Sequence, residues 1–205
     1  MGRVHFIVLL FWCAVLLVDG QVVVVATNLV HYKGTNPQLS NHLRAVNQEK
    51  IDHLFVRLKH ARTETEGHMI EFELWQFWTK SGHADIESLM RRAQFLAQQG
   101  YLELSVRLLD RVVSERPEFV DGWNRRANVF YLMRRYNEAL QSIARVLALE
   151  PRHFGALTGK AFIFIKAGRW QEALECLRRA VEIHPFLRER YLLRILEKKL
   201  RWRRL

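Results

Sequence analysis

Hydrophobic and polar positions along residues 86–187 repeat every 34 residues, with a proline near the end of each period. Aligned on these prolines, the chain divides into three windows: 86–119, 120–153 and 154–187. In every window, small residues alternate at fixed places with bulky apolar ones. The matched positions are Pro117, Pro151 and Pro185; Ala93, Ala127 and Ala161; Leu96, Phe130 and Phe164; Ser105, Ala139 and Ala173; Leu109, Ile143 and Leu177. Small residues let two helices approach and large ones fill the space beside them, so the pattern predicts three copies of one helical hairpin.

Helical patterns also precede the repeats. One helical stripe is formed by Ile51, Leu54, Phe55 and Leu58. Thr63 followed by Glu66 predicts a capping box at the start of a second helix. We expect this hairpin, residues 49–85, to cover the exposed side of the first repeat, because the terminal units of a helical array must meet water on one face. Residues 27–48 show no clear periodicity and are expected to form a linker.

The last segment, residues 188–205, carries eight basic residues against two acidic ones. Its basic stripe consists of Arg190, Arg194, Lys198 and Arg201. The opposite side is formed by Tyr191, Leu192, Ile195, Leu196 and Trp202. One interpretation is a helix that caps the last repeat. The alternative is a basic amphipathic element that touches anionic lipid or another polyanion.

The first residues, 1–26, have the order of a secretory signal peptide. Arg3 precedes an apolar run from Phe6 to Val18, and Asp19 and Gly20 follow it. Cleavage after Gly20 or after Ala26 would fit, and an uncleaved membrane anchor is the alternative. We therefore expect an exported protein, either periplasmic or secreted, or one tethered to the membrane through this segment.

Composition narrows the class of protein. An apolar fraction of 49% is typical of a globular chain. The formal net charge of +11 favours acidic partners or anionic surfaces, although it does not bear on the fold. Cys13 lies in the segment expected to be removed, so Cys176 would have no internal disulfide partner.

The three windows resemble the tetratricopeptide repeat (TPR) family, which has this period. Its consensus is matched best by Trp123, Ala127, Phe130, Tyr136, Ala139 and Pro151. Some phrases also look similar to small exported TPR proteins of alphaproteobacteria. The resemblance implies an all-α, right-handed solenoid with three repeats, an N-terminal helical hairpin and a C-terminal capping helix. It implies a concave groove for a protein or peptide partner, and neither catalysis nor a cofactor.

The resemblance also places a set of residues on the groove side of the first helix of each repeat. These are Glu87, Met90, Gln94, Asp121, Asn124, Asn128, Tyr131, Thr158 and Phe162. The row formed by Asn124, Asn128 and Tyr131 could hydrogen-bond a partner's backbone, and Phe162 offers an apolar anchor beside it. Asparagine is a poor choice for a helix interior, which favours a function for Asn124 and Asn128. The alternatives are that both face solvent, or that they bond between adjacent repeats.

A basic ladder is the most regular departure from the family. Arg92, Arg126 and Lys160 stand where the consensus has leucine. Either their aliphatic stems pack on the preceding helix while the charged heads reach water, or they form an electrostatic docking rail. Together with the basic stripe of the last segment, they make up the expected basic surface.

The sequence supports no catalytic site, metal site or cofactor. It contains no HExxH, no CxxC and no glycine-rich phosphate loop, and His53 and His60 are too far apart to hold one ion by themselves. The clamp by which TPR domains grip chaperone C-termini is also absent, because its slots hold Met90, Gln94 and Arg125, or Asn124, Asn128 and Gly159. We predict a non-enzymatic scaffold that binds a protein or peptide partner. The alternative is a protein that binds a polyanion or membrane surface, and neither a small-molecule substrate nor nucleic acid is expected.

Overall fold

A computed structural model describes the backbone of residues 14–18, 21–25 and 37–202, and the side chains of residues 45–201. The chain divides into two units, residues 1–46 and 47–205. Helix α1 (Pro37–Lys59) begins in the first unit and ends in the second. The other elements of the second unit are α2 (Glu64–Thr79), α3 (Ala84–Gln98), α4 (Leu102–Glu115), α5 (Val120–Leu132), α6 (Tyr136–Leu149), α7 (Phe154–Lys166), α8 (Trp170–Ile183), the short 3-10 helix η1 (Arg188–Arg190) and α9 (Tyr191–Trp202).

The first unit contains two short strands, β1 (Ala14–Val18) and β2 (Gln21–Val25), which pair antiparallel with Ala14 opposite Val25. They lie within the expected signal segment, and the rest of that segment is outside the described residues. The expected linker is partly wrong. Helix α1 starts at Pro37, a residue type that suits the first turn of a helix because it has no backbone N–H to leave unbonded. Over the residues that the structure describes, no helix is long and apolar enough to cross a membrane.

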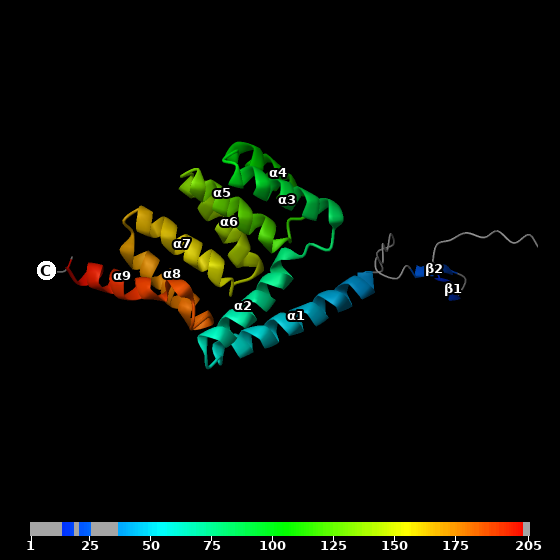
Figure 1. Cartoon of the computed structure of the whole chain (residues 1–205), viewed down its shortest axis with the longest axis horizontal. Coiled ribbons are helices and arrows are strands. Elements are labelled where there is room, and N and C mark those ends of the chain that lie inside the picture. The colour runs from blue at the N-terminus through cyan, green and yellow to red at the C-terminus, as the bar shows by residue number, and fades with distance from the viewer. Residues whose placement is uncertain (1–13, 19–20, 26–36, 203–205) are drawn as a thin grey trace, which may run out of the picture. The chain divides into compact units, whose positions relative to one another are not determined.

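The second unit contains the three predicted hairpins, in phase with the prolines. They are α3 with α4, α5 with α6 and α7 with α8, stacked one after another (Figure 1). The second helix of each hairpin ends two residues before Pro117, Pro151 or Pro185. The turn inside each hairpin has one residue with positive φ: Gly100 and Gly168, and between them Arg134 at 58°. Glycine adopts this conformation without steric cost, whereas arginine adopts it under strain.

The small positions of the repeat lie where the helices touch. Ala93, Ala127 and Ala161 are buried, and so are Ser105, Ala139 and Ala173 on the second helices. In the first repeat the hydroxyl of Ser105 donates to the carbonyl oxygen of Ala93 at 2.8 Å. A polar residue is therefore accommodated at this contact because its only donor is satisfied across the helix pair. The predicted all-α solenoid of three repeats is confirmed.

The N-terminal hairpin, formed by α1 and α2, packs on the second and third repeats and not on the first as expected. Its buried side chains Leu58, Leu74 and Trp78 share a core with Phe154 at the start of α7 and with Ala180 and Leu187 beyond. In Figure 1, α1 and α2 diverge from the turn that joins them, and α2 lies nearer the repeats. Thr63 caps α2 as predicted, with its hydroxyl accepting from the backbone N–H of Glu66. The reciprocal half of the capping box is shifted by one residue, because the Glu66 carboxylate accepts from the backbone N–H of Arg62 at 2.9 Å.

Two glycines explain why the hairpin docks at this place. A β-carbon at Gly155 would lie 3.2 Å from the ring of Trp75, and one at Gly67 would lie 3.0 Å from the ring of Phe186. Any larger residue at either position would press on an aromatic ring. The close approach of α2 to the third repeat therefore depends on the absence of side chains at both contacts.

Helix α9 covers the end of the third repeat, which confirms the predicted cap. Its packed side is formed by Leu192, Leu193, Leu196 and Leu200. Arg178 on α8 donates to Glu197 at 2.8 Å and fixes the same side. The two expected sides of residues 188–205 differ from the structure in two respects. Tyr191 and Ile195, expected on the apolar side, are more than half exposed, and Arg190, expected in the basic stripe, belongs to η1. The basic stripe is therefore interleaved with apolar side chains and is not opposite to them.

Candidate partner-binding groove

A cavity of about 280 Å³ opens between α2, α5, α7 and η1. From the repeats it is lined by Asn124, Asn128, Phe154, Gly155, Thr158, Gly159 and Phe162. The facing wall consists of Glu71 and Trp75 on α2, with Leu187 and Glu189 beyond α8. The cavity thus combines two amide groups, three aromatic side chains and two carboxylates in one hollow.

The structure brings together four of the residues predicted to line the groove. Asn128 is exposed and Phe162 is half-buried, so both can meet a partner. Asn124 is buried except for its edge, and Thr158 donates its hydroxyl to the carbonyl oxygen of Phe154 at 2.9 Å. Thr158 therefore forms part of the cavity wall, but its hydroxyl donates within its own helix and not to a partner.

The other predicted groove residues lie elsewhere. Met90 is buried in the core of the first two repeats. Tyr131 packs against that core near Tyr136, with the two ring centroids 5.8 Å apart. Glu87 is half-buried and accepts from the Ser81 hydroxyl at 3.4 Å. None of these three residues lines the cavity that the described side chains form.

A second hollow of about 180 Å³ lies between α3, α4 and α5, and Asn128 borders both hollows. Arg125 crosses this region, donating to Asp121 at 2.7 Å and to Gln94 at 2.5 Å. Burial raises the pKa of Asp121, and the ion pair with Arg125 opposes that rise. Asp121 and Arg125 are therefore hydrogen-bonded to each other. The side-chain amide of Asn128 stays available to a partner.

Helix α2 supplies the half of the groove that the sequence analysis missed. Trp75 contacts the position of Gly155, at the start of the first helix of the third repeat. Its ring also stands edge-on to His153, with centroids 5.2 Å apart.

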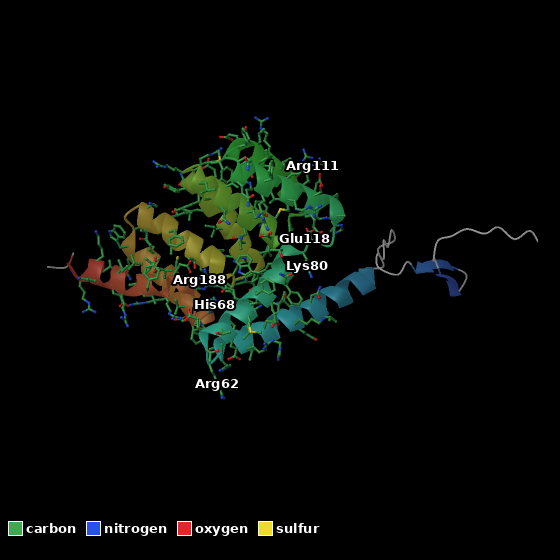
Figure 2. The ribbon with its side chains drawn as sticks, viewed as in Figure 1. Arg62, His68, Lys80, Arg111, Glu118 and Arg188 are labelled. Atoms are coloured by element: carbon green, nitrogen blue, oxygen red, sulfur yellow. The ribbon has the colours of Figure 1, made fainter. Side chains whose placement is uncertain are left out.

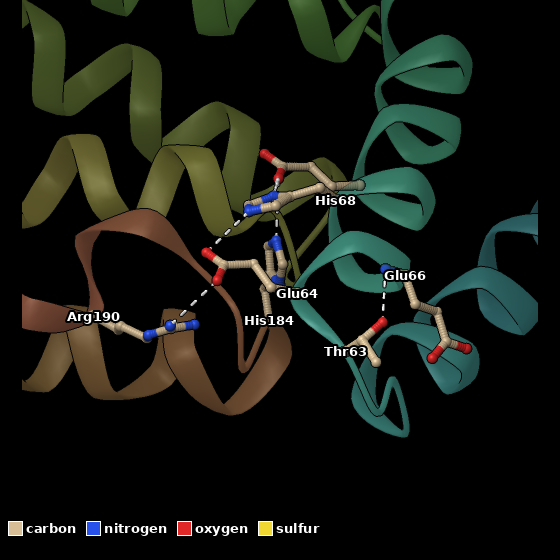
Figure 3. A network of polar contacts seen from close by, with 7 residues as sticks. Thr63, Glu64, Glu66, His68, His184 and Arg190 are labelled. Atoms are coloured by element: carbon tan, nitrogen blue, oxygen red, sulfur yellow. Dashed lines mark hydrogen bonds and ion pairs between the residues drawn. The ribbon is translucent and has the colours of Figure 1, made fainter.

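A cluster of His68, Glu71 and His184 lies at the edge of this wall (Figure 3). Oε2 of Glu71 is 3.0 Å from Nδ1 of His68 and 3.1 Å from Nε2 of His184. Burial alone would raise the pKa of Glu71, but hydrogen bonds from His184 and His68 outweigh it and hold the pKa at about 2. The carboxylate is therefore ionised at neutral pH. Sequence motifs predicted no metal site, yet this donor set is one that could hold a metal ion.

His153 is the second buried histidine of the region. It caps α7, with Nδ1 accepting from the backbone N–H of Ala156 at 3.0 Å. Its ring stacks on Trp78 with centroids 4.1 Å apart. Burial lowers the pKa of His153 to about 3, so the side chain is neutral in the folded protein at pH 7.

The basic ladder has different surroundings at each step. Arg126 donates to Asp110 at 2.7 Å and to Ser142 at 2.8 Å, and its guanidinium lies over the ring of Phe130. Lys160 lies over the ring of Phe164, while Arg92 is exposed. The Arg126 head is thus engaged within the protein, which matches neither interpretation of the ladder, because one expects the head in water and the other expects it free to meet a partner. In the last segment Arg194, Lys198 and Arg201 are exposed, and Arg190 pairs weakly with Glu64 at 3.9 Å.

Comparisons with known proteins show which family parts of this chain match. A family model described as "Tetratricopeptide repeat" matches residues 130–194. A "TPR repeat-containing protein" of Rhizobium etli is 33% identical over 103 residues, which is half of this chain. The aligned part also spans half the length of that relative.

Solved structures with a similar fold are TPR domains as well. The first TPR of Spaghetti (RPAP3), bound to an HSP90 peptide, superposes with a TM-score of 0.54 and 16% identity, over 56% of this chain and 92% of that one. The TPR2B domain of yeast Sti1, in a complex with pHsp70, has a TM-score of 0.53 and 17% identity, over 59% and 99% of the two chains. At these identities the likeness establishes the fold.

Proposed function

Since this chain belongs to the tetratricopeptide repeat family, we propose that it is a non-enzymatic scaffold whose groove between α2, α5 and α7 holds a protein or peptide partner. The observation that carries the proposal is the placement of the Asn128 amide beside Phe162 in one open hollow. An amide can hydrogen-bond an extended backbone, and an aromatic side chain supplies the apolar anchor on which most of the binding energy of such contacts depends.

The groove favours a partner other than an acidic chain terminus. Two of the similar solved structures hold chaperone peptides. Here, however, Glu71 and Glu189 line one wall, and the opposite wall offers amides instead of lysines. A terminal carboxylate in this hollow would face like charges, which disfavours binding. We therefore propose an internal peptide segment or a partner helix as the occupant.

The groove can be tested by comparing what two variants capture. We expect the double substitution Asn128→Ala and Phe162→Ala to weaken the main partner by at least about tenfold, because each removes a central contact worth on the order of 1 kcal/mol or more. The measurement is quantitative mass spectrometry of proteins captured from the native compartment, followed by titration of the leading candidate. The matched control is Phe95→Ala, an equally aromatic but exposed residue of α3 outside both hollows. A partner retained by the double variant, or lost equally from the control, would contradict the proposal.

A second function rests on the exposed side of α9. Tyr191 and Ile195 are exposed there beside Arg194, Lys198 and Arg201. This mixture of apolar and basic side chains is typical of elements that lie on anionic membranes. We propose binding to an anionic surface as the alternative, consistent with the net charge of +11.

We expect the triple substitution Arg194→Glu, Lys198→Glu and Arg201→Glu to abolish co-sedimentation with phosphatidylserine vesicles. Each basic residue near such a surface contributes about 1 kcal/mol, so removing three lowers partitioning by at least about 100-fold. The control replaces three exposed arginines of the repeats, Arg91, Arg107 and Arg145, and should retain most of the binding. Vesicle binding that is insensitive to salt, or equal in both triple variants, would rule out a specific role for α9.

We propose in addition that the protein is exported. The support is the positive start, the apolar run and the small residues that follow it in residues 1–26.

A further inference from the structure

Three potential metal ligands meet where α2 approaches the end of α8. His68 and Glu71 lie three residues apart on α2, and His184 caps the C-terminus of α8. Their ligand atoms all lie within 4.8 Å of one another, although His184 is 113 residues from Glu71. His184 is fully buried and presents Nε2 to the carboxylate (Figure 3).

The donor set and its spacing suit zinc. Two imidazoles and one carboxylate are a recurrent set of three protein ligands for Zn²⁺. Tetrahedral ligands at the usual distances of about 2.0–2.1 Å from zinc stand roughly 3.3 Å from one another. The two separations from Glu71 Oε2 are 3.0 and 3.1 Å, so small side-chain rotations would admit an ion between these atoms.

The surroundings of His68 call for a cation. One ring nitrogen faces Glu71 at 3.0 Å, and the other faces Glu64 at 3.5 Å. A neutral imidazole has a single N–H, so it can donate to only one of two carboxylates. A metal ion on Nδ1 resolves the conflict, because Nε2–H then donates to Glu64. Glu64 is held in turn by Arg190 at 3.9 Å, and such outer carboxylates commonly orient metal-bound histidines.

The partial burial of Glu71 points the same way. Its side chain is only about a quarter exposed, and among the described ion pairs its partners are the two imidazoles. A divalent cation between the three side chains would neutralise a carboxylate in such a place.

An access route and room for a fourth ligand are also present. A cavity of about 330 Å³ is lined by His68, Glu71, Phe72, Trp75, Leu187, Arg188 and Glu189. Figure 2 shows His68 and Arg188 in this region. Water could reach the fourth position from this side.

We propose that His68, Glu71 and His184 hold a Zn²⁺ ion that ties the N-terminal hairpin to the end of the third repeat. Because the site would join two parts of the chain, the ion would stabilise the docked position of α2 and with it one wall of the groove.

The test is a calorimetric titration of Zn²⁺ into the full-length, chelator-stripped protein at about pH 7.5, where unprotonated imidazoles bind metal. We expect one ion per chain with a dissociation constant in the micromolar range or below. Glu64→Gln should retain the stoichiometry and weaken the affinity by about 10- to 100-fold, the usual effect of losing an outer-shell partner. Glu71→Gln and His68→Ala should weaken it at least as much, and the control His60→Ala, an exposed histidine beyond α1, should leave it unchanged.

A second readout covers variants that fold poorly. Co²⁺ added to the unaltered protein should give the intense visible absorption of a four-coordinate site, and Zn²⁺ should displace it. Absence of zinc binding at micromolar concentrations, affinity that is unchanged in Glu71→Gln, or six-coordinate Co²⁺ would each overturn the proposal. In those cases the histidines would simply be hydrogen-bonded to Glu71.

Discussion

Replacing Trp78 with alanine is expected to lower the free energy of unfolding by about 3–5 kcal/mol, the usual cost of truncating a large buried aromatic residue. Trp78 is 4% exposed and lies in the core that joins the N-terminal hairpin to the third repeat. Its ring stacks on His153 and lies 5.4 Å from that of Phe154. The substitution would remove these contacts at once and leave a cavity between α2 and α7. Urea denaturation followed by far-ultraviolet circular dichroism measures the change.

The control for this prediction is Phe72→Ala on the same helix. Phe72 is 64% exposed, so its truncation should change the free energy of unfolding by no more than about 0.5 kcal/mol. If the hairpin were a loosely attached appendage, Trp78→Ala would leave the main transition in place and add a separate early one. A single transition shifted to lower urea would show that α2 and the repeats unfold together.

Lowering the pH from 6.5 towards 4.5 is expected to destabilise the protein by up to about 1.4 kcal/mol per pH unit through His153 alone. The pKa of His153 is lowered from 6.5 to about 3 in the folded state, mainly by burial. Between these values the unfolded chain binds a proton that the folded chain does not, so the unfolded state gains stability as the pH falls. Glu71 acts in the same direction only at lower pH, because the pKa of its carboxyl is near 4.5 when unfolded and about 2 when folded.

The matched variant is His153→Asn. Asparagine can still cap α7 by accepting from the N–H of Ala156, but it does not titrate. We expect lower stability at pH 7 from the lost ring stack and a flatter dependence on pH than in the unaltered protein. Urea denaturation at several pH values from 7 to 4.5 measures both effects. An exposed histidine variant, His60→Asn, should keep the original slope, and a slope that is equal in all three proteins would refute the role of His153.

The repeats could be predicted from the sequence because their packing is local and periodic. Ala127 and Ala139, for example, are buried on the two helices of one hairpin, and the same arrangement recurs in every window. Pro151 ends α6 through its own backbone chemistry, and no distant residue is needed to explain it. All of these features are determined by about 34 consecutive residues, and the pattern repeats three times.

The rest of the site depends on contacts that no local pattern contains. Helix α2 shows an apolar stripe, but the stripe does not say which surface it covers, and it covers Phe154 instead of the first repeat. His68 and Glu71 lie about one helical turn apart, which in the sequence is an ordinary pair. The third member of the cluster, His184, comes from the other end of the domain and joins them only in the folded structure. Likewise, Ile195 remains exposed because α9 meets the third repeat through Leu196.

The contact between Glu71 and His184 predicts the order in which parts of the chain fold. In an open array each repeat touches only its neighbours, so assembly can begin anywhere and spread. Here the two contacting residues are separated by 113 positions, and bringing them together while the intervening chain is loose carries a large entropic cost. Once the three hairpins have stacked, the same ends are held at a fixed distance. Docking of α2 is therefore expected to be the final step of folding, and its release the first step of unfolding.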